Sequence, residues 1–156
     1  MSFLAWLEST AYAEWILYGI SGWPLMLTAH AFGLAIAVGV IFLMSLRLLG
    51  RFTDIPLTSV REILNLAWVG VAINIFSGLS LFASGATRYA TNIPFIVKIT
   101  AILIGIAALH YAQRVLKKEA VTWASQGVDS NGKFLAWFLI IIWFVAVITG
   151  RLIAYI

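Results

Sequence analysis

The sequence predicts an all-α integral membrane protein: a four-helix bundle preceded by an N-terminal interfacial helix. Hydrophobic residues make up 63% of the 156 residues and charged residues only 10%, whereas soluble domains are about half apolar and ~25% charged. The mean hydropathy is +1.02. Four long apolar stretches follow one another, each able to cross a ~30 Å hydrocarbon layer as a helix that rises ~1.5 Å per residue. We expect one transmembrane domain, residues 1–156.

The first stretch, residues 3–20, differs from the later ones because it contains Glu8 and Glu14. Two unpaired carboxylates inside a membrane are costly, whereas a helix at the membrane surface keeps them in water. We therefore predict an interfacial amphipathic helix ahead of the bundle at 24–156. Its apolar face is expected to enter the membrane through four side chains: Trp6, Leu7, Trp15 and Ile16.

The four spans are predicted at residues 24–49, 59–84, 92–116 and 134–156. Pro24 suits the first turn of the first span, and Gly50 suits its C-terminal cap. Ser59 and Glu62 have the spacing of a capping box at the start of the second span. Asn92, followed by a proline two residues later, is a good cap for the third span.

Lysine and arginine residues are distributed unevenly between the two predicted ends of the bundle. Seven lie on the side of the connections after the first and third spans, and three on the opposite side. The seven are Arg47, Arg51, Arg61, Arg114, Lys117, Lys118 and Lys133; the three are Arg88, Lys98 and Arg151. The positive-inside rule then places both termini outside the cytoplasm.

Each predicted span carries a polar residue at the same depth, roughly 7–9 Å below the outer boundary. These residues are His30, Ser80, Lys98 and Arg151, with Ser77 nearby. Three of the four can be positively charged, and no carboxylate lies at this level. An anion, ordered water or lipid headgroups would complete such a site.

A b-type haem fits this set of residues. His30 would ligate the iron, and the propionates would pair with Lys98, Arg151 or Arg88. His110 lies roughly 15 Å deeper along the helices, so it either belongs to a separate inner metal site or is a structural histidine. A second axial ligand from the His30 of another protomer would make the protein a homo-oligomer. The resulting hypothesis is electron transfer near the periplasmic face, with the quinone pool or a periplasmic protein as redox partner.

Small residues within the spans indicate close helix packing. Gly70 and Gly78 flank Asn74 on one face of the second span, and two further pairs of small residues follow the same spacing: Gly33 with Ala37, and Ala101 with Gly105.

Other function classes find little support in the sequence. The absence of cysteine rules out thiolate metal sites and disulfides. Basic residues outside the spans are too few to form a nucleic-acid-binding face. No buried acid is available to orient a histidine in a hydrolytic triad. We therefore expect a redox carrier or an accessory subunit rather than a catalyst.

Three segments also prompt a family comparison: HAFGLAIAVGVIFLMSLRLLG, PFIVK and WFVAVITGRLIAY. Together they resemble a group of small four-helix bacterial inner-membrane proteins, distantly like the copper-resistance D and cytochrome b561-type bundles. The resemblance singles out His30, Arg47, Lys98 and Arg151, and it implies membrane redox or metal biology. The chain has two histidines, fewer than the four of a two-haem cytochrome b561.

Two alternatives to haem binding remain at this point. The first is a cofactor-free accessory or assembly subunit of a membrane complex, in which small residues pack against partner helices. The second is a transporter of copper or another metal ion, using Met26 and His30, which lie four residues apart on one helix face.

Overall fold

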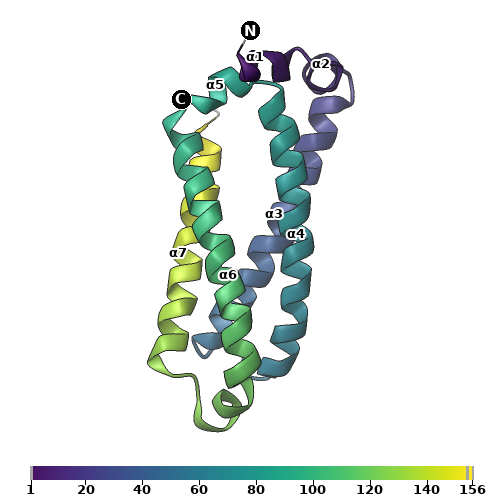
Figure 1. Ribbon diagram of the computed structural model, residues 1–156. Coiled ribbons are helices and arrows are strands. Elements are labelled where there is room, and N and C mark those ends of the chain that lie inside the picture. The colour runs from purple at the N-terminus through teal and green to yellow at the C-terminus, as the bar shows by residue number, and fades with distance from the viewer. Residues whose placement is uncertain (1, 154, 156) are drawn as a thin grey trace.

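The computed structural model describes residues 2–153 and 155, and its four long helices form an upright antiparallel bundle (Figure 1). They are α3 (Gly22–Leu48), α4 (Leu57–Ala83), α6 (Ile93–Gln126) and α7 (Ser130–Leu152). All four are long and apolar enough to cross a membrane. The chain is therefore an all-α, multi-pass membrane protein, as the sequence predicts, and its apolar helices face lipid.

Each span packs against the spans before and after it in the sequence, and α7 closes the ring against α3. The contacts within the α3–α4 and α6–α7 hairpins are more extensive than the contacts between the hairpins. We call the end with both chain termini the terminal end and the opposite end the loop end (Figure 1). The bundle is thus two tight hairpins that meet along a looser seam.

The helix ends explain where the chain turns. After α3, Gly50 has φ +86°, and the Arg51 amide donates to the Leu46 carbonyl at 2.9 Å, as in a Schellman motif. Asn92 Oδ1 accepts from the Phe95 amide at 3.0 Å and caps α6, as predicted. The predicted capping box at Ser59 is wrong, because α4 already begins at Leu57, directly after Pro56.

The third span continues beyond its predicted end. Helix α6 has 34 residues and ends at Gln126, so at ~1.5 Å per residue it is far longer than a ~30 Å hydrocarbon layer. Residues 117–126, which follow the predicted end of this span, are helical as well and extend α6 out of the membrane. The carboxylate of Asp129 accepts from the Gly132 amide at 2.8 Å and starts α7 before the predicted position. Ala154 and Ile156, at the end of the predicted range, lie outside the described residues.

The N-terminal segment forms two short helices instead of the single predicted one: α1 (Phe3–Glu8) and α2 (Ala11–Tyr18). Thr10 divides them because its Oγ1 accepts from the Ala13 amide at 3.3 Å and caps α2. Both lie across the terminal end together with α5 (Ala86–Ala90) (Figure 1). Ile16 is completely buried in the protein, whereas Trp6 and Trp15 remain exposed. Their entry into the membrane surface stays a prediction.

Hydrogen bonds attach this segment to the bundle. The Glu8 carboxylate accepts from the Thr87 amide at 2.8 Å and from the Thr87 hydroxyl at 2.7 Å, which joins α1 to α5. The Tyr12 hydroxyl and Ser80 Oγ lie 2.8 Å apart, which joins α2 to α4. The segment is therefore a cover fixed to the terminal end of the bundle.

Replacing Tyr12 with phenylalanine is expected to loosen α2. The change removes a partly buried hydrogen bond, typically worth about 1 kcal/mol, and keeps the ring. Hydrogen exchange of the α2 amides should become faster while exchange in α6 is unchanged. Tyr18→Phe is the control, because Tyr18 is 79% exposed; equal effects of the two variants would contradict a role for the Tyr12–Ser80 bond.

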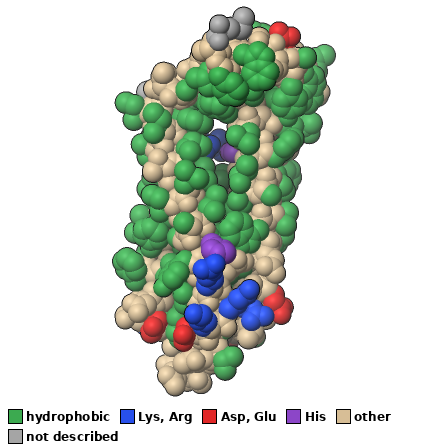
Figure 2. All heavy atoms as spheres, in the orientation of Figure 1, with side chains coloured by type: hydrophobic (Ala, Val, Ile, Leu, Met, Phe, Trp, Pro, Cys, Tyr) green, Lys and Arg blue, Asp and Glu red, His purple; other side chains and the backbone are tan. Residues whose placement is uncertain are grey.

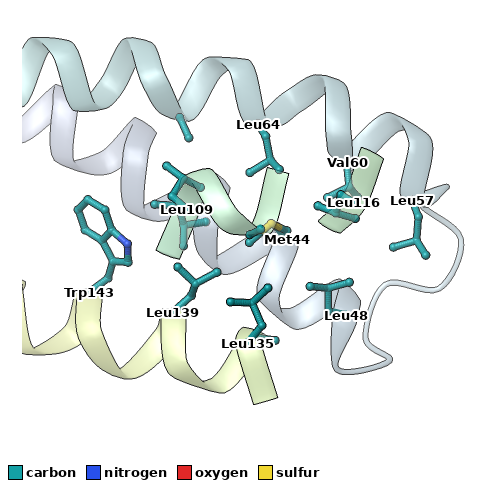
Figure 3. Close-up of a cluster of buried hydrophobic side chains, with 14 of the residues drawn as sticks. Met44, Leu48, Leu57, Val60, Leu64, Leu109, Leu116, Leu135, Leu139 and Trp143 are labelled. Atoms are coloured by element: carbon teal, nitrogen blue, oxygen red, sulfur yellow. The ribbon is translucent and has the colours of Figure 1, made fainter. Parts of the chain in front are cut away.

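The large hydrophobic core occupies only the loop half of the bundle. Its buried residues come from all four spans and include Met44, Leu64, Leu109 and Leu139, whose side chains point toward one another in Figure 3. Buried residues in the terminal half of the spans are mostly small: Ala83, Ala101 and Ala146. Fewer large buried side chains therefore lie between the spans in the terminal half.

Candidate functional site

The crossing of α3 and α4 determines where His30 lies. A Cβ atom on Gly70 would be 2.5 Å from the Ala37 nitrogen and 2.7 Å from the Gly33 carbonyl oxygen. A Cβ atom on Gly33 would be 2.6 Å from Nδ2 of Asn74. The two backbones therefore touch, and glycine is required on both sides, as the small-residue pattern predicts. His30 lies one turn before this contact and faces α4.

The hydrogen bonds around His30 define its tautomer. Nδ1 of His30 lies 3.0 Å from Ser77 Oγ. The Ser77 hydroxyl has one proton, and Oγ lies 2.7 Å from the Ile73 carbonyl oxygen, to which it donates. When the Ser77 proton is directed at the Ile73 carbonyl, a neutral imidazole carries its own proton on Nδ1 and donates it to Ser77, which leaves a free lone pair on Nε2.

Two glycines make room for the polar side chains. A Cβ atom on Gly78 would be 3.4 Å from Cε1 of His30, and a Cβ atom on Gly150 would be 3.4 Å from Nζ of Lys98. The imidazole of α3 thus lies against α4, and the amine of α6 lies against α7. In each hairpin, a basic side chain of the first helix thus contacts a glycine of the second helix.

The two basic side chains come from different hairpins. His30 lies against Gly78 and Lys98 lies against Gly150, and both are half-buried. Figure 2 shows a hollow between α4 and α6 in the terminal half, with basic and histidine side chains deep inside it. Each hairpin therefore contributes one basic side chain to the terminal half of the bundle.

No acidic residue of the sequence lies near this pair. The six acidic residues are Glu8, Glu14, Asp54, Glu62, Glu119 and Asp129, all of them in the N-terminal segment or toward the loop end. A buried amine without a carboxylate favours a negatively charged ligand or water as its partner.

The structure does not bring together all the residues predicted for this site. Ser80 is buried, but its hydroxyl is bonded to Tyr12 and to the Phe76 carbonyl, so it fixes the N-terminal cover. Arg88 and Arg151 are exposed. Arg151 follows Gly150, the residue that faces Lys98, and successive helix residues point ~100° apart. The common depth of these residues stays a prediction, and depth alone does not determine the direction in which a side chain points.

The residues of the inner layer have other roles. His110 is exposed, and its ring meets the Trp68 ring edge-on with centroids 6.4 Å apart. The Trp68 indole donates to Gln113 Oε1 at 2.9 Å and links α4 to α6. The Arg47 guanidinium donates to the Ile55 carbonyl at 2.6 Å and orders the loop after α3. Arg47, which the family resemblance singles out, thus lies far along α3 from His30.

Ser77 and Gly150 complete the site, although the sequence indicates them only weakly. Ser77 shares its helix face with Gly70 and Asn74, at the helical spacing of seven and three residues, and this spacing is the signal that could have identified it. Gly150 is part of the Gly-Arg pair near the end of the last span, where the arginine is the more conspicuous residue.

Metal ions need several suitable ligands at one place. Across residues 2–153 and 155, no group of three or more His, Cys, Asp or Glu side chains is arranged to hold one. Met26, the other residue of the predicted copper site, is buried one turn before His30.

Fold and site together define a class: a small multi-pass membrane bundle with an inward-facing imidazole and amine in a loosely filled half. Comparison with known proteins adds nothing to this class, because no family model, curated protein or solved structure matches the chain. The function must therefore be argued from the residues themselves.

Proposed function

We propose that the terminal half of the bundle binds one b-type haem and that His30 is the axial ligand of its iron. The observation that carries this proposal is the hydrogen bond from Nδ1 of His30 to Ser77, 3.0 Å long. It holds the ring in place and leaves the Nε2 lone pair for a ligand. A metal-binding histidine commonly donates its other ring nitrogen in this way.

The ligands available favour haem over a bare metal ion. A structural zinc ion takes four ligands, and copper sites combine histidine with thiolate or thioether ligands. The porphyrin already supplies four nitrogens to its iron, so one or two protein side chains are enough. A lone imidazole with a free nitrogen, which is what the terminal half offers, fits haem better than copper transport through Met26 and His30.

The residues around His30 also suit the porphyrin ring and its propionates. The Lys98 amine can pair with a propionate, and the absence of a side chain at Gly78 and Gly150 lets His30 and Lys98 lie against the neighbouring helices. When bound, haem supplies one-electron redox chemistry. His30 would hold and orient it, Lys98 would neutralise part of its charge, and the N-terminal cover would limit access of water from the terminal end.

Electron transfer is the activity that follows from this arrangement. With the terminal end on the periplasmic side of a bacterial inner membrane, the haem would lie close to that surface and within reach of quinone or a periplasmic redox protein. His110 lies in the loop half, so a second protein ligand from histidine would have to come from another copy of the chain. We include a homo-oligomer in the proposal for this reason.

The direct test is the visible absorption spectrum of the full chain, purified in mild detergent from cells supplied with iron and a haem precursor. A Soret band, with α and β bands that sharpen on reduction, would support the proposal. Folded protein that has no haem spectrum and takes up no added haemin would contradict it. That result would favour a cofactor-free accessory subunit instead.

Replacing Lys98 with methionine is expected to weaken haem retention by about tenfold, the effect of losing one charge-assisted hydrogen bond. Methionine keeps the length and most of the volume of the side chain, so the contact with Gly150 is preserved. Transfer of haem to apomyoglobin measures retention. Arg151→Met is the control, because Arg151 is exposed; equal losses in the two variants would detach Lys98 from the proposed site.

A further inference from the structure

A second pocket lies at the loop end, in the groove between α6 and α7. Its volume is about 440 Å³, and residues from the last turns of α6 and the first turns of α7 line it. It is separate from the His30–Lys98 site, which is in the terminal half. Nothing in the proposed haem chemistry uses it.

The pocket lies at the depth of lipid headgroups. If the hydrocarbon layer begins near Ile93, where α6 starts, a thickness of ~30 Å ends about 20 residues later, close to Gln113. Tyr111 and Leu135 then line the apolar side of the pocket, and Lys118 and Asp129 line its outer side. Tyr111 supplies an amphipathic ring of the kind that is typical of this boundary.

The charged groups of the pocket include both signs. Arg114 and Lys118 are its bases, and Glu119 and Asp129 are its acids. One oxygen of Asp129 accepts from the Gly132 amide at 2.8 Å, which fixes this carboxylate at the start of α7 and leaves its second oxygen for another donor. Figure 2 shows acidic and basic side chains close together at the loop end of this face.

We propose that this pocket binds the headgroup of a phospholipid that carries both a phosphate and a primary amine, as phosphoethanolamine lipids do. Arg114 and Lys118 bind the phosphate. Glu119 and Asp129 accept from the ammonium group. Tyr111 and Leu135 contact the first part of the acyl chains. A pocket for an anionic headgroup would need the two bases alone, and the two acids would repel it.

The choice of a lipid over a soluble ligand follows from the position of the pocket. Its apolar side faces the hydrocarbon and its charged side faces the headgroup layer, so a membrane lipid meets both without leaving the bilayer. A soluble phosphoamine would satisfy the charged residues but leave the apolar side without a partner.

Native mass spectrometry of the full chain, released from nanodiscs of equal parts phosphatidylethanolamine and phosphatidylglycerol, tests the proposal. We expect phosphatidylethanolamine to be retained at least fivefold over phosphatidylglycerol. Lys118→Gln should reduce this retention about tenfold, the effect of one lost charge-assisted hydrogen bond. Lys117→Gln is the matched control, because Lys117 is the preceding residue on α6 and does not line the pocket.

Glu119→Gln tests recognition of the amine separately from recognition of the phosphate, because it removes one partner of the amine and leaves both bases in place. The preference between the two lipids should then fall toward unity or reverse. Three results would overturn the proposal: equal retention of both lipids by the unchanged chain, equal losses in the Lys117 and Lys118 variants, or displacement of the lipid by free phosphoethanolamine at equal concentration. The last result would assign the pocket to a soluble ligand.

Discussion

The His30→Ala variant is expected to lose the Soret band while the protein still folds. Only one nitrogen of His30 is available to ligate the iron, because Nδ1 is bonded to Ser77. Alanine removes that nitrogen without adding volume beside Gly78. We expect haem content to fall below about a tenth of that of the unchanged chain, because a lone remaining Lys98–propionate pair contributes only a few kcal/mol. The pyridine haemochrome assay measures it.

His110→Ala is the matched control, since His110 is the other histidine of the chain and its side chain is exposed in the loop half. Its haem content should be unchanged. If His110→Ala loses the spectrum and His30→Ala keeps it, the ligand is assigned to the wrong histidine. If neither variant changes the spectrum of a haem-containing protein, histidine ligation itself is wrong.

The Gly70→Ala variant is expected to destabilise the α3–α4 hairpin strongly. The added Cβ would meet backbone atoms of α3, 2.5 Å and 2.7 Å away. Backbone cannot rotate aside as a side chain can, so the helices must separate. Overpacking of this kind costs about 3 kcal/mol when the neighbours cannot move. The free energy of unfolding in mixed detergent micelles should fall by that amount.

Separation of the helices also has a functional consequence. It moves His30 away from Ser77, so Gly70→Ala should weaken haem retention together with stability. Gly39→Ala is the control: Gly39 is on α3, and in the described part of the chain no atom beyond its neighbours and the nearby backbone of α3 lies within 4 Å of the position its Cβ would take. This control should be neutral or slightly more stable, by about 0.5–1 kcal/mol, because alanine favours the helix. Destabilisation of both variants to the same extent would contradict the close crossing.

Much of the architecture could be predicted because it depends on local properties. A run of apolar residues long enough to span the membrane must form a helix, since every backbone polar group has to be satisfied within the segment. Short connections then force neighbouring spans to be antiparallel. Glycines spaced along one face predicted the helix contact at Gly33 and Gly70. The helix ends at Gly50 and Asn92 followed from the same local reasoning.

Which residues form the site was harder to predict. The position of a side chain depends on its depth along the helix and also on the rotation of the helix about its axis, and the sequence pattern indicates only the depth. Four residues were predicted at one depth: His30, Ser80, Lys98 and Arg151. In the structure, Ser80 bonds to Tyr12 and Arg151 is exposed. The direction in which a side chain points depends on how each helix is rotated about its axis. Packing against the other helices sets this rotation, and the rotation cannot be predicted from the hydropathy of the segment.

The sequence by itself determined that the chain is a four-span membrane protein, because transfer of backbone and side chains from water to lipid depends on composition within each segment. Only the tertiary structure decided which polar groups meet. The backbone contact at Gly33 and Gly70 turns His30 toward Ser77, and the contact at Gly150 turns Lys98 toward the same seam. These orientations arise from contacts between residues far apart in the chain, and therefore exist only once the helices are packed.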